Sequence, residues 1–214
     1  MDSEGYSQTI PVMPRDNAAR PAAAPLLAED ARLMLAYVAG DAAAFERLYA
    51  LHRGGLYGFL HRQCPRPTWV DDLFQETWLA VVRARADYQP SAAFRTWLYG
   101  IARNKLIDRL RLHEPALLAD LLPEGEEDED PLDRQPAEPA QDPARQLANR
   151  QLGQALEQAL RALPAAQREV FLLREQADMG LDEIAALTGV PAETAKSRLR
   201  YAVAKLKAVL AGVA

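Results

Sequence analysis

Residues 94–111, FRTWLYGIARNKLIDRLR, bring aromatic and basic side chains together in one short stretch. The rings come from Phe94, Trp97 and Tyr99. Five cations lie between and after them, namely Arg95, Arg103, Lys105, Arg109 and Arg111. Aromatic rings can stack on a base that has left its duplex, while cations hold the phosphate backbone. The same composition also fits a core helix with solvated arginines, because aromatic residues at helical spacing are usually buried. The residues alone leave both interpretations open.

Helical spacing separates two faces of this stretch. Phe94, Leu98 and Ile101 recur at intervals of three and four residues and are expected to face a core. Trp97, Asn104, Asp108 and Arg111 share another face with Gly100. Glycine inside a helix costs about 1 kcal/mol relative to alanine. We expect that the missing side chain of Gly100 allows another chain to approach closely.

A second candidate lies near the C-terminus, in residues 181–207, which read as a helix-turn-helix. Ile184, Ala185 and Leu187 are expected to point inward, and Gly189 can adopt the positive φ of a tight turn. Pro191 suits the first position of the next helix. That helix carries hydroxyls and cations on its outer surface, typical of a helix that reads a DNA major groove. The alternative is a helical hairpin with a solvated basic face.

The elements that must position these residues are helical throughout. The sequence predicts an all-α fold with two small helical domains joined by a flexible acidic linker, the C-terminal one containing the helix-turn-helix. Helical periodicity covers 29–113 and 144–214, with helix starts expected at Asp30 and Asp41 and a break at Gly40. Residues 1–28 are rich in Pro and Ala and are expected to be disordered. In 70–83 one face is apolar and the opposite face carries acids and Gln75.

Charge is unevenly distributed along the 214 residues. The chain as a whole carries −5, yet residues 114–143 hold eleven acids, one base and six prolines. That segment alone carries −10, so the remainder carries +5, which fits a polyanionic partner. Such a composition predicts a linker. The acids of 124–130 either are a solvated tether or occupy a channel built for RNA, and the sequence leaves both open.

Composition also argues against other classes of protein. No apolar run approaches the length of a membrane span, and the N-terminus lacks the pattern of a secretory signal. Cys64 is the only cysteine, so no internal disulfide can form and a reducing cytoplasm fits. The three histidines, expected at the surface or at helix caps, have no metal-ligand spacing. With no phosphate loop or nucleophile–base pair, we expect no catalysis, no cofactor and no metal.

Several segments together resemble one family. FRTWLYGIARNKLIDRLR resembles the promoter-melting helix of bacterial extracytoplasmic-function (ECF) sigma factors, a compact group of the sigma-70 family. DDLFQETWLAVVRA resembles their polymerase-binding helix. ALRALPAAQREVFLLRE with the helix-turn-helix resembles their C-terminal domain. Agreement of several motifs in order is far more specific than any one of them.

The resemblance implies a domain plan and a set of site residues. Residues 29–113 would be sigma region 2, 114–143 the linker and 144–214 sigma region 4. Polymerase would be bound by Asp71, Asp72, Gln75 and Glu76. The −10 strand, with one base captured before the helix, would be held by Tyr88, Gln89, Ser91, Ala92, Trp97, Arg103, Asn104, Lys105 and Asp108. The −35 duplex would be read by Pro191, Thr194, Lys196, Ser197, Arg198, Arg200 and Tyr201.

The implied function is to direct core RNA polymerase to particular promoters and to start transcription there. The implied partners are the β′ clamp and β flap of polymerase, promoter DNA and an anti-sigma factor, with no membrane insertion and no homo-oligomer. A stand-alone helix-turn-helix regulator is the alternative, although it gives no reason for the DDLFQE segment. A helical adaptor would leave the aromatic helix unexplained as well.

Overall fold

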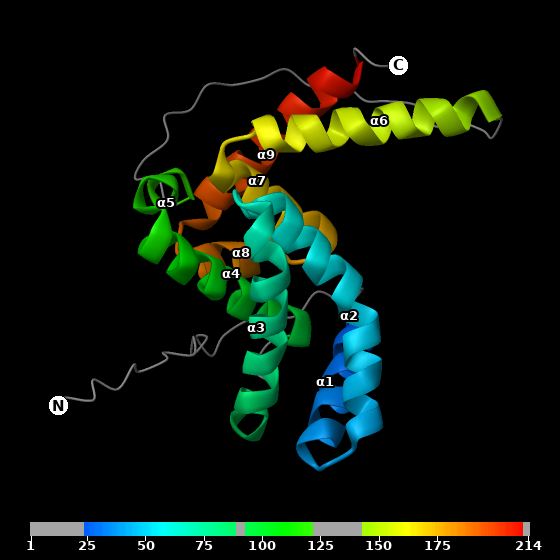
Figure 1. Cartoon of the computed structure of the whole chain (residues 1–214), viewed down its shortest axis with the longest axis vertical. Helices are drawn as coiled ribbons and strands as arrows, with labels where there is room; N and C mark the ends of the chain where they lie inside the picture. The colour runs from blue at the N-terminus through cyan, green and yellow to red at the C-terminus, as the bar shows by residue number, and fades with distance from the viewer. Residues whose placement is uncertain (1–23, 89–92, 122–142, 212–214) are drawn as a thin grey trace.

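The structure is a computed structural model that describes residues 24–88, 93–121 and 143–211 (Figure 1). Within these ranges every regular element is a helix, which confirms the all-α prediction. The α-helices are α1 (Ala24–Val38), α2 (Ala42–Gln63), α3 (Val70–Arg83), α4 (Phe94–His113), α5 (Pro115–Leu121), α6 (Pro143–Ala162), α7 (Ala165–Gln176), α8 (Leu181–Thr188) and α9 (Ala192–Ala211). Two 3₁₀ turns, Pro67–Trp69 and Ala84–Asp87, flank α3.

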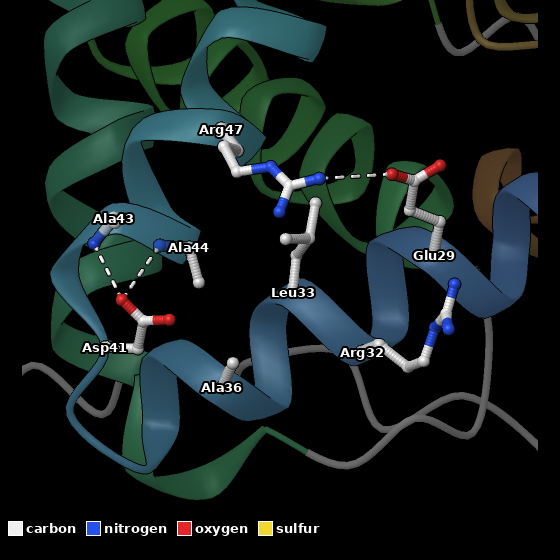
Figure 2. Close-up of a pocket in the computed structure, with 8 residues that line it drawn as sticks. All are labelled: Glu29, Arg32, Leu33, Ala36, Asp41, Ala43, Ala44 and Arg47. Atoms are coloured by element: carbon white, nitrogen blue, oxygen red, sulfur yellow. Dashed lines mark hydrogen bonds and ion pairs between the residues drawn. The ribbon is translucent and has the colours of Figure 1, made fainter.

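Helices α1 and α2 form a hairpin whose turn the sequence specifies. Gly40 has a φ of 104°, a conformation that side chains disfavour. Asp41 caps α2, because its Oδ1 accepts hydrogen bonds from the backbone N–H groups of Ala43 at 2.9 Å and Ala44 at 3.3 Å (Figure 2). A shallow hollow lies between the two helices, where Arg47 faces Glu29. The predicted helix start at Asp41 and the break at Gly40 are therefore confirmed.

The predicted helix start at Asp30 was wrong. Helix α1 begins at Ala24, and Asp30 lies inside it, buried with its Oδ2 3.0 Å from Nε2 of His52. The acid is thus the partner of a partly buried histidine rather than a cap. His52 in turn is not the surface or capping residue that we expected.

The first part of the predicted linker also differs from expectation. Residues 115–121 form helix α5, which begins at a proline and buries Leu121. Leu117 and Leu118 pack against the core as well. The prediction of a linker was based on the number of prolines and acids over thirty residues. Such an average does not reveal a short apolar segment that the fold can bury. The acidic run 124–130 lies outside the described residues.

The C-terminal helices form the predicted helix-turn-helix. Ile184 and Ala185 of α8 are buried, and Gly189 ends α8 with a φ of 74°. Pro191 comes one residue before α9 rather than at its first position, a shift within the usual uncertainty of helix ends. Helix α6 packs along α9 through a small separate cluster centred on Leu160, Leu163 and Leu206.

The two helical units pack directly against each other. One continuous core contains Phe59 and Leu106 of the N-terminal unit together with Leu173 and Ile184 of the C-terminal unit. Gly100 of α4 faces α8, so that a Cβ built there would lie 3.3 Å from Cδ1 of Leu187. The chain that approaches Gly100 closely is thus the protein's own C-terminal unit. This packing positions the candidate site residues described next.

Candidate nucleic-acid and polymerase interface

The outer face of α3 carries the acidic residues predicted to bind polymerase. Asp71, Asp72 and Gln75 are exposed and Glu76 is half-exposed, whereas Leu73 and Trp78 on the opposite face are buried. The amphipathic pattern predicted for this helix is therefore confirmed. Asp71 and Asp72 lie in its first turn, where the helix dipole favours negative charge.

Exposed apolar groups lie next to these acids. The hydroxyl of Tyr57 donates a hydrogen bond to Oδ1 of Asp71 at 3.0 Å, and its ring meets Phe74 edge-on at 5.6 Å between centroids. Tyr57 is 41% exposed and Leu79 is 52% exposed. Acids around an exposed aromatic and aliphatic patch are a composition that suits a protein partner.

Arg109 joins this acidic face to helix α4. Its Nη2 lies 2.6 Å from Oε1 of Glu76, and its Nη1 lies 3.9 Å from Oδ2 of Asp72. The guanidinium also lies over the ring of Trp69, at 5.9 Å from the centroid. One cation therefore fixes the position of α4 relative to two of the predicted polymerase-binding residues.

An aromatic cluster forms the start of α4. Trp97 is partly exposed and packs against Tyr88 at 5.1 Å and Phe94 at 5.9 Å between ring centroids. Tyr88 is buried, and its hydroxyl has no hydrogen-bond partner among the described residues. Burial, helped by the charge of Asp30, raises the pKa of Tyr88 to about 12. Gln89, Ser91 and Ala92, the other predicted loop residues, lie outside the described residues.

The remaining candidates on α4 divide between its open side and its packed side. Asn104 and Lys105 are partly exposed, and Asp108 is exposed and paired with Arg111 at 3.0 Å. Arg103, in contrast, is only 6% exposed. Its Nε donates to Oε1 of Glu169 at 2.9 Å, and its Nη2 donates to Oε2 at 3.4 Å. Arg103 was expected to face a nucleic-acid strand, but in this conformation it is buried against Glu169.

Glu169 is the buried centre of a charged cluster between the two units. It belongs to α7 and is 1% exposed. Burial raises its pKa, while the guanidinium groups of Arg103, Arg198 and Arg168 act in the opposite direction. A buried carboxylate needs such partners, because leaving it unpaired would be costly.

The recognition helix α9 presents most of its predicted residues outward. Pro191, Lys196 and Arg200 are exposed, while Thr194, Ser197 and Tyr201 are partly exposed. The guanidinium of Arg200 lies 5.3 Å from the ring centroid of Tyr201. Arg198 differs from the prediction, since it is 3% exposed and lies on the side of Glu169.

Sequence reasoning missed Glu169 and Tyr57, and it counted Arg109 among the cations of 94–111 without its acidic partners. For Glu169 a signal was present, because it shares one face of α7 with the buried Ala166, Val170 and Leu173. A charge inside an apolar stripe indicates a buried partner. For Arg109 and Tyr57 the sequence holds no comparable signal, because their partners come from other helices.

Two further classes of feature were searched for in the described ranges. No group of three or more His, Cys, Asp or Glu side chains there could hold a metal ion. None of the helices in those ranges has the length and apolar character needed to cross a bilayer.

Comparison with known families assigns both units. Residues 48–114 match the model of sigma-70 region 2, and residues 153–206 match that of sigma-70 region 4. The first range includes the acidic face of α3 and all of α4, and the second includes α7, α8 and most of α9. A stand-alone helix-turn-helix regulator has no reason to carry region 2, so this alternative is not favoured.

Individual relatives support the same assignment to a family. RNA polymerase sigma factor CarQ of Myxococcus xanthus is 33% identical over 167 residues, which cover 78% of this chain and 89% of CarQ. ECF RNA polymerase sigma factor RpoE of Cereibacter sphaeroides is 32% identical over 170 residues, covering 78% and 86%. Among solved structures, CnrH in complex with the cytosolic domain of CnrY matches with a TM-score of 0.57 and 27% identity, covering 86% of this chain and 98% of CnrH. From two sigma regions in order and relatives that span most of the chain, it follows that this protein belongs to the ECF sigma factors of RNA polymerase, in the sigma-70 family.

Proposed function

We propose that the acidic face of α3 is the surface that binds core polymerase. Asp71, Asp72, Gln75 and Glu76 lie together on it, beside the exposed Tyr57. Charges at the edge of an interface speed association and select the partner, while a central aromatic residue supplies affinity. The clamp of β′ is the expected partner of this face, and the flap of β that of the C-terminal unit.

We further propose that the two units contact promoter DNA in different ways. Trp97, Asn104, Lys105 and Asp108 of α4, with Tyr88 and Arg103, would hold the melted −10 strand. The predicted loop residues Gln89, Ser91 and Ala92 would complete that site. Helix α9 would enter the major groove of the −35 duplex with Pro191, Thr194, Lys196, Ser197, Arg198, Arg200 and Tyr201. A melted strand needs both rings for its bases and cations for its phosphates, which explains the composition of α4.

Regulation and location follow from the same assignment. We infer that an anti-sigma factor binds this chain, as the cytosolic domain of CnrY is bound to CnrH. We expect the protein to act in the cytoplasm, where polymerase and promoters are. It would be an initiation factor without catalysis of its own.

The observation that carries this proposal is the presence of regions 2 and 4 in one chain, each with a polar outer face. The test is transcription in vitro with core polymerase, genomic DNA and the purified chain, followed by sequencing of transcript starts. New start sites that share two upstream elements are the expected result. An unchanged set of transcripts would refute the proposal.

Variants of the α3 face test the residue assignment. Replacing both Asp72 and Gln75 by alanine is expected to weaken binding to core polymerase by about tenfold, the loss typical of central interface residues. Glu46→Ala is the matched control, because Glu46 is an exposed acid on α2 and is not one of the predicted polymerase-binding residues. Affinity can be measured by fluorescence anisotropy of the labelled chain. Equal losses in the control and the double variant would contradict the assignment.

A further inference from the structure

Asp30 and His52 form a polar pair inside the N-terminal unit. The acid lies on α1 and is buried, and the side chain of the histidine on α2 is 15% exposed. An ionised carboxylate can only accept hydrogen bonds, so Nε2 of His52 is the donor across the 3.0 Å to Oδ2 of Asp30. Burying a carboxylate is costly unless it is paired, so the contact constrains both side chains. The pair therefore fixes the histidine ring at one place between the two helices.

The ring of His52 supports the aromatic cluster at the start of α4. Its centroid lies 5.3 Å from that of Phe94, which is fully buried. Phe94 in turn meets Tyr88 at 6.3 Å between centroids, and Trp97 packs on both rings. Burial first, and the charge of Asp30 second, raise the pKa of Tyr88, so the acid acts on this cluster as well. A chain of contacts thus runs from Asp30 through His52 to Trp97.

Helix α1 packs on both elements that carry these rings. It contacts the 3₁₀ turn Ala84–Asp87, which leads into Tyr88, and it contacts α4, which begins at Phe94. The guanidinium of Arg85 lies over the Tyr37 ring of α1, at 5.3 Å from the centroid. Helix α1 therefore joins the two sides of the aromatic cluster.

The first turn of α4 has no capping side chain to hold it. Ala93 is its N-cap residue, and no side chain there accepts a hydrogen bond from the helix. A cap normally fixes the start of a helix by satisfying free backbone N–H groups. The position of Phe94, and with it that of Trp97 one turn later, must then come from packing. The ring of His52 is one of the groups that supply this packing.

We propose that Asp30 and His52 are positioning residues for the −10 site, which hold Trp97 at the place where it meets the melted strand. The proposal rests on the role proposed above for α4, and it adds α1 to the elements that this role requires. The match to sigma-70 region 2 begins at residue 48, so Asp30 lies outside the range that carries the family assignment. Neither side chain is placed to touch the strand itself, since both are largely buried.

The position of Trp97 can be read directly in the free chain. Tryptophan is replaced by 5-fluorotryptophan, and the fluorine resonance of Trp97 is assigned with Trp97→Phe. Asp30→Ala removes the acceptor and is expected to shift or broaden this resonance. Asp30→Asn has nearly the same shape and keeps an acceptor oxygen, so it should keep the wild-type resonance. Glu29→Ala is the control, because it removes a partly exposed ion pair with Arg47 from the same helix, and it should leave the resonance unchanged.

A second variant acts at the next contact of the chain. His52→Gln keeps an N–H donor for Asp30 but removes the ring that lies against Phe94. It should move the Trp97 resonance as well, while the resonance of Trp69 stays in place. Circular dichroism shows which of the two disruptive variants keeps the wild-type helicity. An unmoved Trp97 resonance in a variant that folds in this way would overturn the proposal.

Strand binding separates positioning from a merely structural role. Holoenzyme made with each variant is titrated with a fluorescein-labelled single strand from a promoter mapped by the start-site sequencing described above, and anisotropy gives the affinity. Asp30→Ala is expected to weaken binding about tenfold, the scale of one hydrogen bond to a charged group, while Asp30→Asn stays within about twofold of wild type. Affinity for core polymerase should not change. Equal losses of both affinities would indicate a structural role and would contradict the proposal.

The two measurements together distinguish failure of the positioning role from failure of the −10 role. A moved Trp97 resonance together with lost strand affinity supports the proposal. A moved resonance with unchanged strand affinity would overturn it, although the −10 role of α4 would stand as long as wild-type holoenzyme binds the strand. If wild-type holoenzyme does not bind the strand, the −10 role is wrong and the proposal falls with it, even where the fluorine spectra show the contact.

Discussion

Cys64 is buried at the end of α2, where its thiol donates a hydrogen bond to the carbonyl of Arg66 at 3.2 Å. Burial raises the pKa of this thiol, against smaller opposite effects of the backbone at Arg66 and of the charge of Arg109. Only the thiolate reacts with disulfide reagents, so a raised pKa lowers the reactive fraction at any given pH below it. The thiol is thus a packing group.

The reactivity of Cys64 should therefore depend on folding. At pH 8 the native chain is expected to react with DTNB about tenfold more slowly than the chain in urea, where the thiol is exposed and its pKa is ordinary. The native rate should rise as the pH increases towards the raised pKa. Equal rates for native and unfolded chains would show that the thiol is accessible in the native state.

Lys105 provides a residue-scale test of the −10 assignment. It lies part-exposed on the open side of α4. If it neutralises one phosphate of a single strand, Lys105→Ala should reduce the salt slope of oligonucleotide binding by about 0.7. Holoenzyme is titrated with a labelled −10 strand at several salt concentrations. Arg53→Ala removes an exposed cation from α2 and is the control, which should leave the slope unchanged.

Outward-facing polar residues could be predicted one by one, but buried charges could not. Lys196 and Arg200 are exposed on α9 as expected, since helical periodicity separates them from Ala195 and Ala202. Arg103 and Arg198 have the same residue type, yet both are buried. Their carboxylate partner lies 66 residues from Arg103 in the sequence, beyond the reach of any local pattern.

At the scale of helices, α2 contains two adjacent glycines in different surroundings. A Cβ on Gly54 would meet nothing within 4 Å, whereas one on Gly55 would press on the Tyr99 hydroxyl. Tyr99 is almost fully buried, so its ring has little room to move. The two positions form a matched pair on one helix.

Alanine substitutions at these positions should therefore have opposite effects. Gly54→Ala is expected to raise the free energy of unfolding by about 1 kcal/mol, the difference in helix propensity. Gly55→Ala is expected to lower the free energy of unfolding, because the steric overlap with the Tyr99 hydroxyl costs more than the gain in helix propensity. Urea unfolding followed by circular dichroism measures both. A stabilised Gly55→Ala variant would mean that Tyr99 and α7 can move aside.

Helices with strong periodicity or turn chemistry could be located from the sequence. Examples are α3, with its apolar face, and the turn at Gly189 between α8 and α9. Helix α5 could not, because its three leucines are embedded in a proline-rich and acidic segment. What stabilises α5 is the tertiary core that it covers, and this core is not visible in a local window.

For the whole molecule, a continuous core predicts cooperative unfolding. Since buried residues of both units belong to one cluster, the free chain should melt in a single calorimetric transition with equal calorimetric and van't Hoff enthalpies. Glu169→Gln should reduce this coupling and broaden or split the transition. Two well-separated transitions in the wild type would mean that the units fold independently.

The two-unit, all-α architecture could be predicted from the sequence, but the contact between the units could not. A proline-rich acidic segment between two helical units suggested a tether, and a tether permits any relative placement. The observed interface depends on shape, on Gly55 and Gly100 as close approach points, and on a few polar pairs. Such complementarity arises only in three dimensions.

Arg109 has a consequence for how this protein can change over generations. It neutralises Glu76 and Asp72 on the face proposed for polymerase, and it anchors the helix proposed for DNA. Loss of Glu76 would leave the guanidinium with only the more distant Asp72, and loss of Arg109 would leave both acids without the cation that joins them to α4. The face proposed for polymerase and the helix proposed for DNA therefore depend on each other at these positions, and paired replacements in the two helices are expected in its descendants.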